Sequence, residues 1–280
     1  MTTHFQTCHL CEAMCGLAIE MTEGQITSIR GDKDDVFSQG HICPKAVALQ
    51  DIHEDPDRLK FPQRRRGDRW ETISWEDAFE EVSNQLVAIQ KRYGQDAVAT
   101  YLGNPNVHNY TALLYLPSLL KILGTRNRFS ATSVDQLPYM LASLLMLGHQ
   151  LLSPIPDLER TQFLLVLGAN PLVSNGSAMT APGISKRLKA LQARGGKLIV
   201  IDPRYTETAR LADEHFFIQP GTDALLLLAM LHTLFSEGLA QPGRLKNFIE
   251  RWDVMQEIAK DFPPEHVAER IGISADDIQR

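Results

Sequence analysis

The chain has 280 residues, of which 44% are hydrophobic and 22% are charged. These ordinary globular values exclude a disordered or fibrous protein, and the length suggests about two domains. The 28 Lys and Arg residues against 34 Asp and Glu residues leave a formal net charge of −6. Such a chain lacks the basic surface that a nucleic-acid partner needs.

No stretch approaches the roughly 20 apolar residues of a membrane helix, and the longest apolar tracts, such as 224–231, fit a buried helix. The first six residues carry neither a signal-peptide pattern nor a twin arginine. We therefore expect a cytoplasmic protein with no membrane segment. In that reducing compartment, four cysteines are expected to be ligands or catalysts rather than disulfides.

All four cysteines lie near the start of the chain, at Cys8, Cys11, Cys15 and Cys43. A haem attachment site would need His after the second cysteine, where Glu12 stands, and a thioredoxin-like pair uses no third cysteine. Structural zinc sites usually take their thiolates as two separated pairs. The observed three-plus-one division favours a 4Fe-4S cluster, in which one tight loop holds three irons and a remote segment holds the fourth. Zinc is the alternative.

Apolar residues alternate over 17–21 and 25–29 around Thr22-Glu23-Gly24, which predicts a β-hairpin between the third and fourth cysteines. Residues 1–57 are therefore expected to form a small, β-rich, cluster-binding domain, stabilised by its metal because its own core is thin. Gly16 and Gly40 are expected to let backbone N–H groups approach the sulfurs. The basic run at 64–66 is expected to be a solvated loop.

Residues 58–280 are expected to form a parallel-sheet α/β region, because short apolar runs alternate with helical segments. The first predicted helix begins at Ser74, which starts a capping-box-like sequence, and runs to about Tyr93 with Gly94 as C-cap. The other predicted elements before residue 150 are a strand at 97–101 and helices near 108–123 and 136–147. After it come strands at 163–167 and 197–201, a helix of about 178–193 between them, an apolar run at 216–218 and a helix that opens at 220–223.

Three loops that follow these strands carry small or polar residues, and parallel sheets bind ligands at the carboxyl ends of their strands. Glycine lets a phosphate approach, helix N-termini favour anions, and a carboxylate can accept from the amino edge of guanine. No standard dinucleotide or P-loop motif is present, and ordinary turns use the same residue types, so both interpretations stay open. The candidates are Gly168, Asn170, Pro171, Asp202, Arg204, Gly221, Thr222 and Asp223.

Together these segments resemble the molybdenum and tungsten bis-molybdopterin guanine dinucleotide oxidoreductases, which include formate dehydrogenases, nitrate reductases and relatives of dimethyl sulfoxide reductase. The cysteine pattern ending in Cys43-Pro44-Lys45 is similar to the family's 4Fe-4S domain, and 70–78 is similar to the segment that follows it. The resemblance implies the family's α/β fold, a Mo- or W-bis(molybdopterin guanine dinucleotide) cofactor, and the eight loop residues above as its contacts. It spans essentially the whole chain but only the N-terminal portion of typical members.

The resemblance also suggests where a Mo or W ligand would lie. Formate dehydrogenases of the family carry a cysteine or selenocysteine soon after a Gly-Thr-x-Asn turn, and the same spacing from Gly124-Thr125-Arg126-Asn127 leads to Asp135. Asp135 is therefore either an oxygen ligand of the metal or the N-cap of a helix starting near Gln136. The weaker alternatives are Ser130, Thr132 and Ser133.

Two further residues have roles that the resemblance implies. Lys45 corresponds to a residue between cluster and pterin, where its charge would help electrons pass, and a solvated lysine is the alternative. His108 is either a residue of the substrate cavity or an ordinary core or surface histidine.

The implied function is a two-electron oxidation or reduction of a small-molecule substrate at the metal, with the cluster passing electrons singly to a redox partner protein. The chain would then be a truncated or partial catalytic subunit. The alternative is an iron–sulfur electron-transfer or structural subunit without a molybdenum site, like the large subunit of respiratory complex I, which resembles this family.

Overall fold

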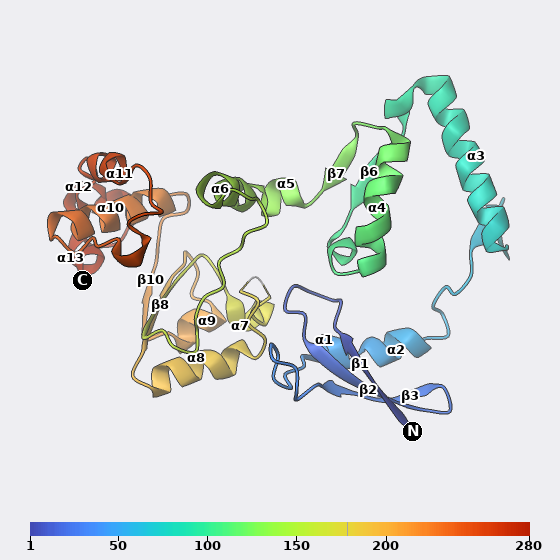
Figure 1. Ribbon diagram of the computed structural model, residues 1–280, viewed down its shortest axis with the longest axis horizontal. Helices are drawn as coiled ribbons and strands as arrows, with labels where there is room; N and C mark the ends of the chain where they lie inside the picture. The colour runs from blue at the N-terminus through green and yellow to red at the C-terminus, as the bar shows by residue number, and fades with distance from the viewer. Residues whose placement is uncertain (178) are drawn as a thin grey trace. The chain divides into compact units, whose positions relative to one another are not determined.

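The computed structural model describes residues 1–177 and 179–280, without the side chains of residues 104 and 105. The chain forms two compact units (Figure 1). The first unit holds Met1–Pro156 with Ser177–Gly183, and the second holds Asp157–Gly176 with Ile184–Arg280. The division into 1–57 and 58–280 suggested by the sequence follows other boundaries and stays a prediction.

The first unit begins with an antiparallel sheet in the order β1-β2-β3. Its strands are β1 (Thr2–Thr7), β2 (Gly16–Thr22) and β3 (Gln25–Gly31). The predicted hairpin is confirmed: Glu23 and Gly24 join β2 to β3 with φ values of 51° and 81°, the left-handed conformation of two-residue hairpin turns. The sequence pattern gives no sign of β1, because all its residues are exposed and show no apolar alternation.

The remaining elements of the first unit are shorter sheets and helices. They are α1 (Pro44–Val47), α2 (Leu49–Glu54), β4 (Gln63–Arg66), β5 (Arg69–Thr72), α3 (Trp75–Tyr93), η1 (Gln95–Ala97), β6 (Thr100–Leu102), η2 (Asn104–Val107), α4 (Tyr110–Leu123), β7 (Arg128–Ser130), α5 (Thr132–Asp135) and α6 (Leu137–Leu147). Strands β4 and β5 pair antiparallel, whereas β6 and β7 pair parallel.

Helix α3 has the predicted ends. The Ser74 hydroxyl accepts from the backbone N–H of Asp77 at 3.0 Å, which satisfies one of the free N–H groups of the first turn. Gly94, with φ of 90°, ends the helix and donates its N–H to the carbonyl of Gln90. The strand expected at 97–101 begins later, at the start of β6, because η1 uses the residues directly after Gly94.

The basic run Arg64-Arg65-Arg66 lies in strand β4, so the prediction of a loop is wrong. The Nε groups of Arg64 and Arg66 each donate to Oε1 of Glu71 on β5 at 2.7 Å. Opposite charges on neighbouring strands stabilise the pairing. The arginines are therefore largely balanced by acids within their own hairpin.

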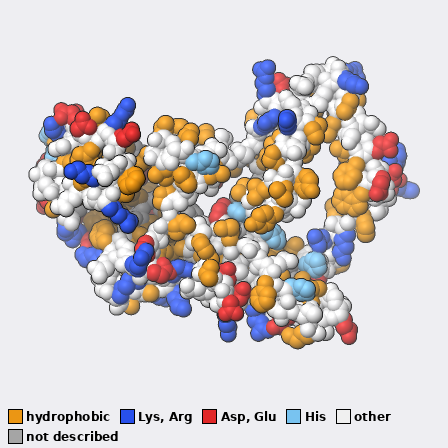
Figure 2. Space-filling view, in the orientation of Figure 1, with side chains coloured by type: hydrophobic (Ala, Val, Ile, Leu, Met, Phe, Trp, Pro, Cys, Tyr) orange, Lys and Arg blue, Asp and Glu red, His pale blue; other side chains and the backbone are white. Residues whose placement is uncertain are grey.

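Helices α4 and α6 confirm the two helices predicted before residue 150, and both are rich in Leu. Each has a single buried residue, Leu123 in α4 and Ser143 in α6. Apolar side chains consequently stand on the surface of this unit (Figure 2). Neither these helices nor any other in the described part of the chain has both the length and the apolar character needed to cross a membrane.

The second unit is built on a parallel sheet in the order β10-β9-β8. Its elements are β8 (Phe163–Leu167), α7 (Pro171–Ser174), α8 (Ile184–Ala193), β9 (Lys197–Ile201), α9 (Glu207–Leu211), β10 (Glu214–Phe216), α10 (Asp223–Ser236), η3 (Gly243–Leu245), α11 (Trp252–Ala259), α12 (Pro264–Ile271) and α13 (Ala275–Gln279). Strands β8 and β9 have the predicted bounds. Strand β10 lies two residues earlier than the apolar run at 216–218.

Helix α8 starts at Ile184, later than expected, because Pro182 and Gly183, with φ of 71°, precede it. Ala178, where the helix was expected to begin, lies outside the described residues. Alternate residues of β9 face opposite sides of the sheet. Ile199 and Ile201 pack with the helices after β10, whereas Leu198 and Val200, both fully buried, lie on the other side, where α8 and α9 contact β9.

Candidate functional site

The first candidate site is a group of four cysteines in the first unit. Cys8, Cys11 and Cys15 lie on the loop between β1 and β2, and Cys43 is the N-cap of α1. The N–H of Cys8 donates to the carbonyl of Cys15 at 2.8 Å and closes the loop. Met14, with φ of 48°, makes the sharp turn inside it. Pro44 is pre-organised as the first helical residue.

The cysteines share one small apolar core. Cys8, Cys15 and Cys43 are between 5% and 8% exposed, and Cys11 is half-buried against the same cluster. Leu17 from β2 and Ile29 from β3 complete its wall. The loop cysteines are therefore held against the predicted hairpin together with the remote Cys43.

Burial is the main cause that raises the pKa of the Cys15 thiol to about 11, and repulsion from the other three cysteines raises it further. Burial also raises the pKa of Cys8, while the nearby charge of Lys45 lowers it. Thiolates crowded in this way need positive charge beside them. Among the described residues, no three His, Cys, Asp or Glu side chains converge closely enough to hold a single metal ion. Four cysteines in one buried group are the donor set of a 4Fe-4S cluster.

The chain between β3 and Cys43 is tied to the hairpin by a compact hydrogen-bond network. The hydroxyl of Ser38 accepts from the N–H of Gly16 at 3.0 Å and donates to the Asp35 carboxylate at 2.6 Å. This bond lowers the pKa of Asp35, as does the backbone N–H of Ser38. The N–H of Gly16 is therefore used by Ser38, and the expectation that Gly16 and Gly40 let backbone N–H groups approach the sulfurs stays a prediction.

Close backbone approach explains two glycines near this network. A Cβ on Gly16 would lie 2.6 Å from the Cβ of Asp35, and a Cβ on Gly31 would lie 2.1 Å from the carbonyl oxygen of Gly40. Both distances are far below van der Waals contact, so the crossing of these segments requires glycine. The crossing fixes the path of the chain towards Cys43.

Lys45 is exposed on α1, and its charge reaches the thiol of Cys8. A place beside the cysteines agrees with the relay role, which stays a prediction. The side chain of His108 is 6% exposed, and its Nε2 lies 3.5 Å from Oε1 of Glu12, the residue that follows Cys11. His108 therefore lies near the cysteine loop with its imidazole shielded from solvent.

Asp135 is the last residue of α5 and is exposed. The N-cap of α6 is Gln136, so the interpretation of Asp135 as a helix cap is wrong, and its role as a ligand stays a prediction. In the turn before β7, the Thr125 hydroxyl donates to the carbonyl of Val98 at 2.6 Å. This turn therefore has a structural role in joining β7 to the chain before β6.

The second candidate site is the carboxyl edge of the sheet in the second unit. The N–H of Gly168 donates to the carbonyl of Ile201 at 2.9 Å, and the N–H of Asp202 donates to the carbonyl of Phe216 at 3.1 Å. These bonds place the ends of β8, β9 and β10 side by side. The three predicted loops therefore all follow strands that end at this edge of the sheet.

Asn170 joins the first two of these loops. Its Oδ1 accepts from the N–H and the hydroxyl of Thr208, at 3.2 and 2.8 Å, and its Nδ2 donates to Glu207 at 2.7 Å. The bond from Asn170 is the main cause that lowers the pKa of Glu207. Pro171 is buried at the start of α7. Asn170 thus ties the loop after β8 to the start of α9, where its partner Thr208 is fully buried.

The remaining predicted residues divide by exposure. Asp202 and Thr222 are buried and bond within their own loops, Asp202 to the N–H of Arg204 and Thr222 to the carbonyl of Gln219. The residues open to a ligand are Gly168, Arg204, Gly221 and Asp223. Gly168 and Gly221 have φ values of 58° and 82°, and no atom lies within 4 Å of a Cβ placed on either.

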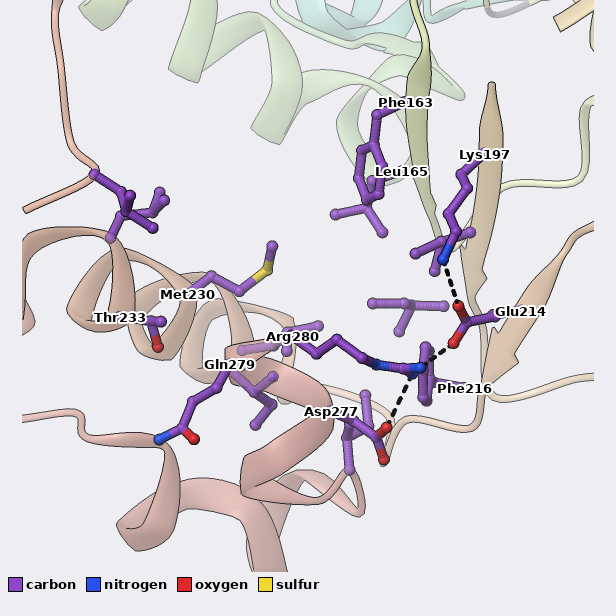
Figure 3. A pocket seen from close by; sticks show the side chains of 17 residues that line it. Phe163, Leu165, Lys197, Glu214, Phe216, Met230, Thr233, Asp277, Gln279 and Arg280 are labelled. Carbon is purple, nitrogen blue, oxygen red and sulfur yellow. Dashed lines mark hydrogen bonds and ion pairs between the residues drawn. The ribbon is translucent and has the colours of Figure 1, made fainter. Parts of the chain in front are cut away.

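A cavity of about 280 Å³ lies between the same sheet and helices α10 and α13 (Figure 3). Its walls include the first residues of all three strands, Phe163, Lys197 and Glu214, so it extends to the edge opposite the three loops. Glu214 pairs with Lys197 at 3.3 Å and with Arg280 at 2.5 Å. None of the predicted site residues lines this cavity.

Two family models cover most of the chain. One, described as the molybdopterin oxidoreductase Fe4S4 domain, matches residues 1–54, and another, described as molybdopterin oxidoreductase, matches residues 58–243. The chain belongs to the molybdopterin oxidoreductase family. The four cysteines lie within the segment matched by the Fe4S4 domain model, and members of the family bind a 4Fe-4S cluster and a molybdenum or tungsten bis-molybdopterin guanine dinucleotide. The predicted fold and cofactors are confirmed.

Several known proteins are similar to the chain. Formate dehydrogenase H of Escherichia coli is 28% identical over 98% of the chain and 38% of its own length, and acetylene hydratase of Syntrophotalea acetylenica is 29% identical over 98% and 37%. The solved structure of acetylene hydratase from Pelobacter acetylenicus matches with a TM-score of 0.80 at 26% identity, over 98% of the chain and 37% of that protein. The chain therefore spans about two fifths of the length of these relatives.

Proposed function

We propose that the chain is the cluster-bearing part of a molybdenum or tungsten oxidoreductase that transfers two electrons to or from a small molecule. The observation that carries this proposal is the gathering of four cysteines in one buried group within the segment matched by the Fe4S4 family model. A three-stranded parallel sheet with open glycines at its carboxyl edge supports it, because that edge is where such sheets bind nucleotide ligands.

In this proposal each group of residues has a defined task. Cys8, Cys11, Cys15 and Cys43 hold a 4Fe-4S cluster, and the positive charge of Lys45 next to Cys8 favours electron passage between cluster and pterin. Arg204 and the open backbone at Gly168 and Gly221 hold the guanine dinucleotide, while Asn170, Pro171, Asp202 and Thr222 fix the loops. Asp223, exposed at the first turn of α10, accepts from the guanine amino edge.

The metal–pterin group supplies two-electron chemistry when bound, and the protein sets its position and surroundings. Asp135 donates a carboxylate oxygen to the metal, a ligand that suits a hard, high-valent ion. Its exposure at the end of α5 leaves the carboxylate free to take up such a bond. The cluster held by the four cysteines would supply one-electron transfer to a redox partner protein. In this proposal the protein acts in the cytoplasm without a nucleic-acid partner.

A second candidate is an iron–sulfur electron-transfer subunit without a molybdenum site. The absence of cysteine at the position of Asp135 favours it, since all four cysteines of the chain belong to the cluster. The open loops of the second unit favour the enzyme. The similarity to acetylene hydratase adds that water addition is a further reaction class to assay.

Metal and cofactor analysis of anaerobically purified protein tests the proposal. We expect about four iron atoms and four acid-labile sulfides per chain, molybdenum or tungsten, and a fluorescent pterin after oxidation. Iron without molybdenum, tungsten or pterin would support the electron-transfer candidate instead. Zinc in place of iron would overturn both.

A further inference from the structure

An aromatic group lies at the carboxyl edge of the sheet in the second unit. Tyr205 follows β9 directly after the Asp202-Pro203-Arg204 turn, His215 lies in β10, and Phe217 follows β10. The ring centroids of Tyr205 and His215 are 5.3 Å apart, and those of His215 and Phe217 are 4.5 Å apart. Both contacts are edge-to-face, an arrangement that stabilises aromatic pairs.

The group is anchored to the loop at its base. The Nε2–H of His215 donates to the carbonyl of Asp202 at 3.1 Å, so the central ring is held by one hydrogen bond and two edge-to-face ring contacts. Tyr205 and Phe217 are nevertheless 52% and 59% exposed. Large exposed rings that are held in place present stacking surfaces at little cost in side-chain entropy.

The neighbours of these rings are suited to the rest of a nucleotide. Arg204, adjacent to Tyr205, has a 70% exposed side chain, and guanidinium groups pair with phosphate oxygens. Gly221 lies four residues after Phe217, and no atom lies within 4 Å of a Cβ placed on it. A ligand could therefore come close to its backbone. A nucleotide whose base lies on these rings would therefore find the Arg204 guanidinium and the open backbone at Gly221 in the same set of loops.

We propose that Tyr205 and Phe217 form the stacking surface for the guanine base of the dinucleotide cofactor, with His215 packed between them. This inference rests on the proposed function and adds the residues that hold the base. Stacking on an aromatic side chain does not distinguish one base from another, because every base has a flat π-face. The surface thus contributes affinity, whereas the acidic edge at Asp223 contributes the preference for guanine.

Binding of GMP to the purified 280-residue chain tests the inference, with ribose 5-phosphate as the probe that lacks a base. Ligand-detected NMR and equilibrium dialysis measure both. We expect Tyr205→Leu and Phe217→Leu each to weaken GMP binding about fivefold to hundredfold, and to leave the weaker binding of ribose 5-phosphate unchanged. Tyr205→Phe keeps the ring and should bind GMP like the parent.

Phe248→Leu is the matched control, because Phe248 is 82% exposed in the same unit but lies beyond η3, outside the three loops. Equal GMP binding by Tyr205→Leu, Phe217→Leu and Phe248→Leu would overturn the inference, as would no GMP binding by the parent chain. Both results leave the proposed function standing if iron, molybdenum or tungsten, and pterin are found. Ring-dependent GMP binding without those metals would instead remove the proposed function alone.

Discussion

Substitution of Gly31 by alanine is expected to disturb cluster binding although Gly31 is no ligand. The added Cβ would lie 2.1 Å from the carbonyl oxygen and 2.5 Å from the carbonyl carbon of Gly40. Ordinary carbon–oxygen contacts are more than about 3 Å, so one backbone has to move by about 1 Å. The segment that moves most easily leads to Cys43, three residues beyond Gly40.

The cost of such overpacking is about 1–3 kcal/mol, and metal ligands tolerate displacements of only about 0.2 Å. We therefore expect Gly31→Ala to lower the iron content, the visible absorption of the cluster and the thermal stability together. Gly24→Ala is the control, since Gly24 has φ of 81° but nothing within 4 Å of an added Cβ. The left-handed backbone should cost about 1–2 kcal/mol, and the variant should keep full iron. Full iron and unchanged melting in Gly31→Ala would refute the reasoning.

Four other variants test separate parts of the structure. Asn170→Ala should destabilise the second unit by about 2–4 kcal/mol, because it leaves buried partners without bonds, and should keep the iron of the first unit; a chemical melt with iron analysis checks this. The pKa of Asp35 is lowered in the folded protein, so its contribution to stability is present above the unfolded pKa and lost as the pH falls through the lower folded pKa. The parent should thus lose stability between about pH 4 and more acidic values, and Asp35→Asn should lose this part of the acid dependence. Cys11→Ser should remove the cluster and part of the N-terminal fold, and iron at parental stoichiometry would contradict the assignment. Asp135→Ala should keep iron but lose molybdenum or tungsten and turnover, and unchanged activity would exclude Asp135 as a ligand.

The elements that the sequence predicted well are those whose pattern has one physical cause. Strands β8 and β9 are continuous apolar runs because a parallel sheet is covered on both faces, and their bounds follow directly. Helix α3 has a side-chain cap at Ser74 and a glycine at its end. The cysteine group was predictable because ligand spacing is local.

What the sequence did not reveal depends on partners remote in the chain. Strand β1 exists through backbone pairing with β2 and buries no side chain, so no pattern marks it. The loop role of Asn170 depends on Thr208, thirty-eight residues later. The aromatic group around His215 likewise combines β10 with residues that follow β9 and β10, and only the arrangement of the sheet places them together.

Helices α4 and α6 have a practical consequence for work with this chain. Leu145 and Met146 are 77% and 81% exposed, and Ile122 is 79% exposed. Large apolar side chains exposed to water favour association between copies of a chain. We therefore expect the protein to self-associate at high concentration. Light scattering as a function of protein concentration would show the range in which the protein does not associate, and ligand titrations can be run there.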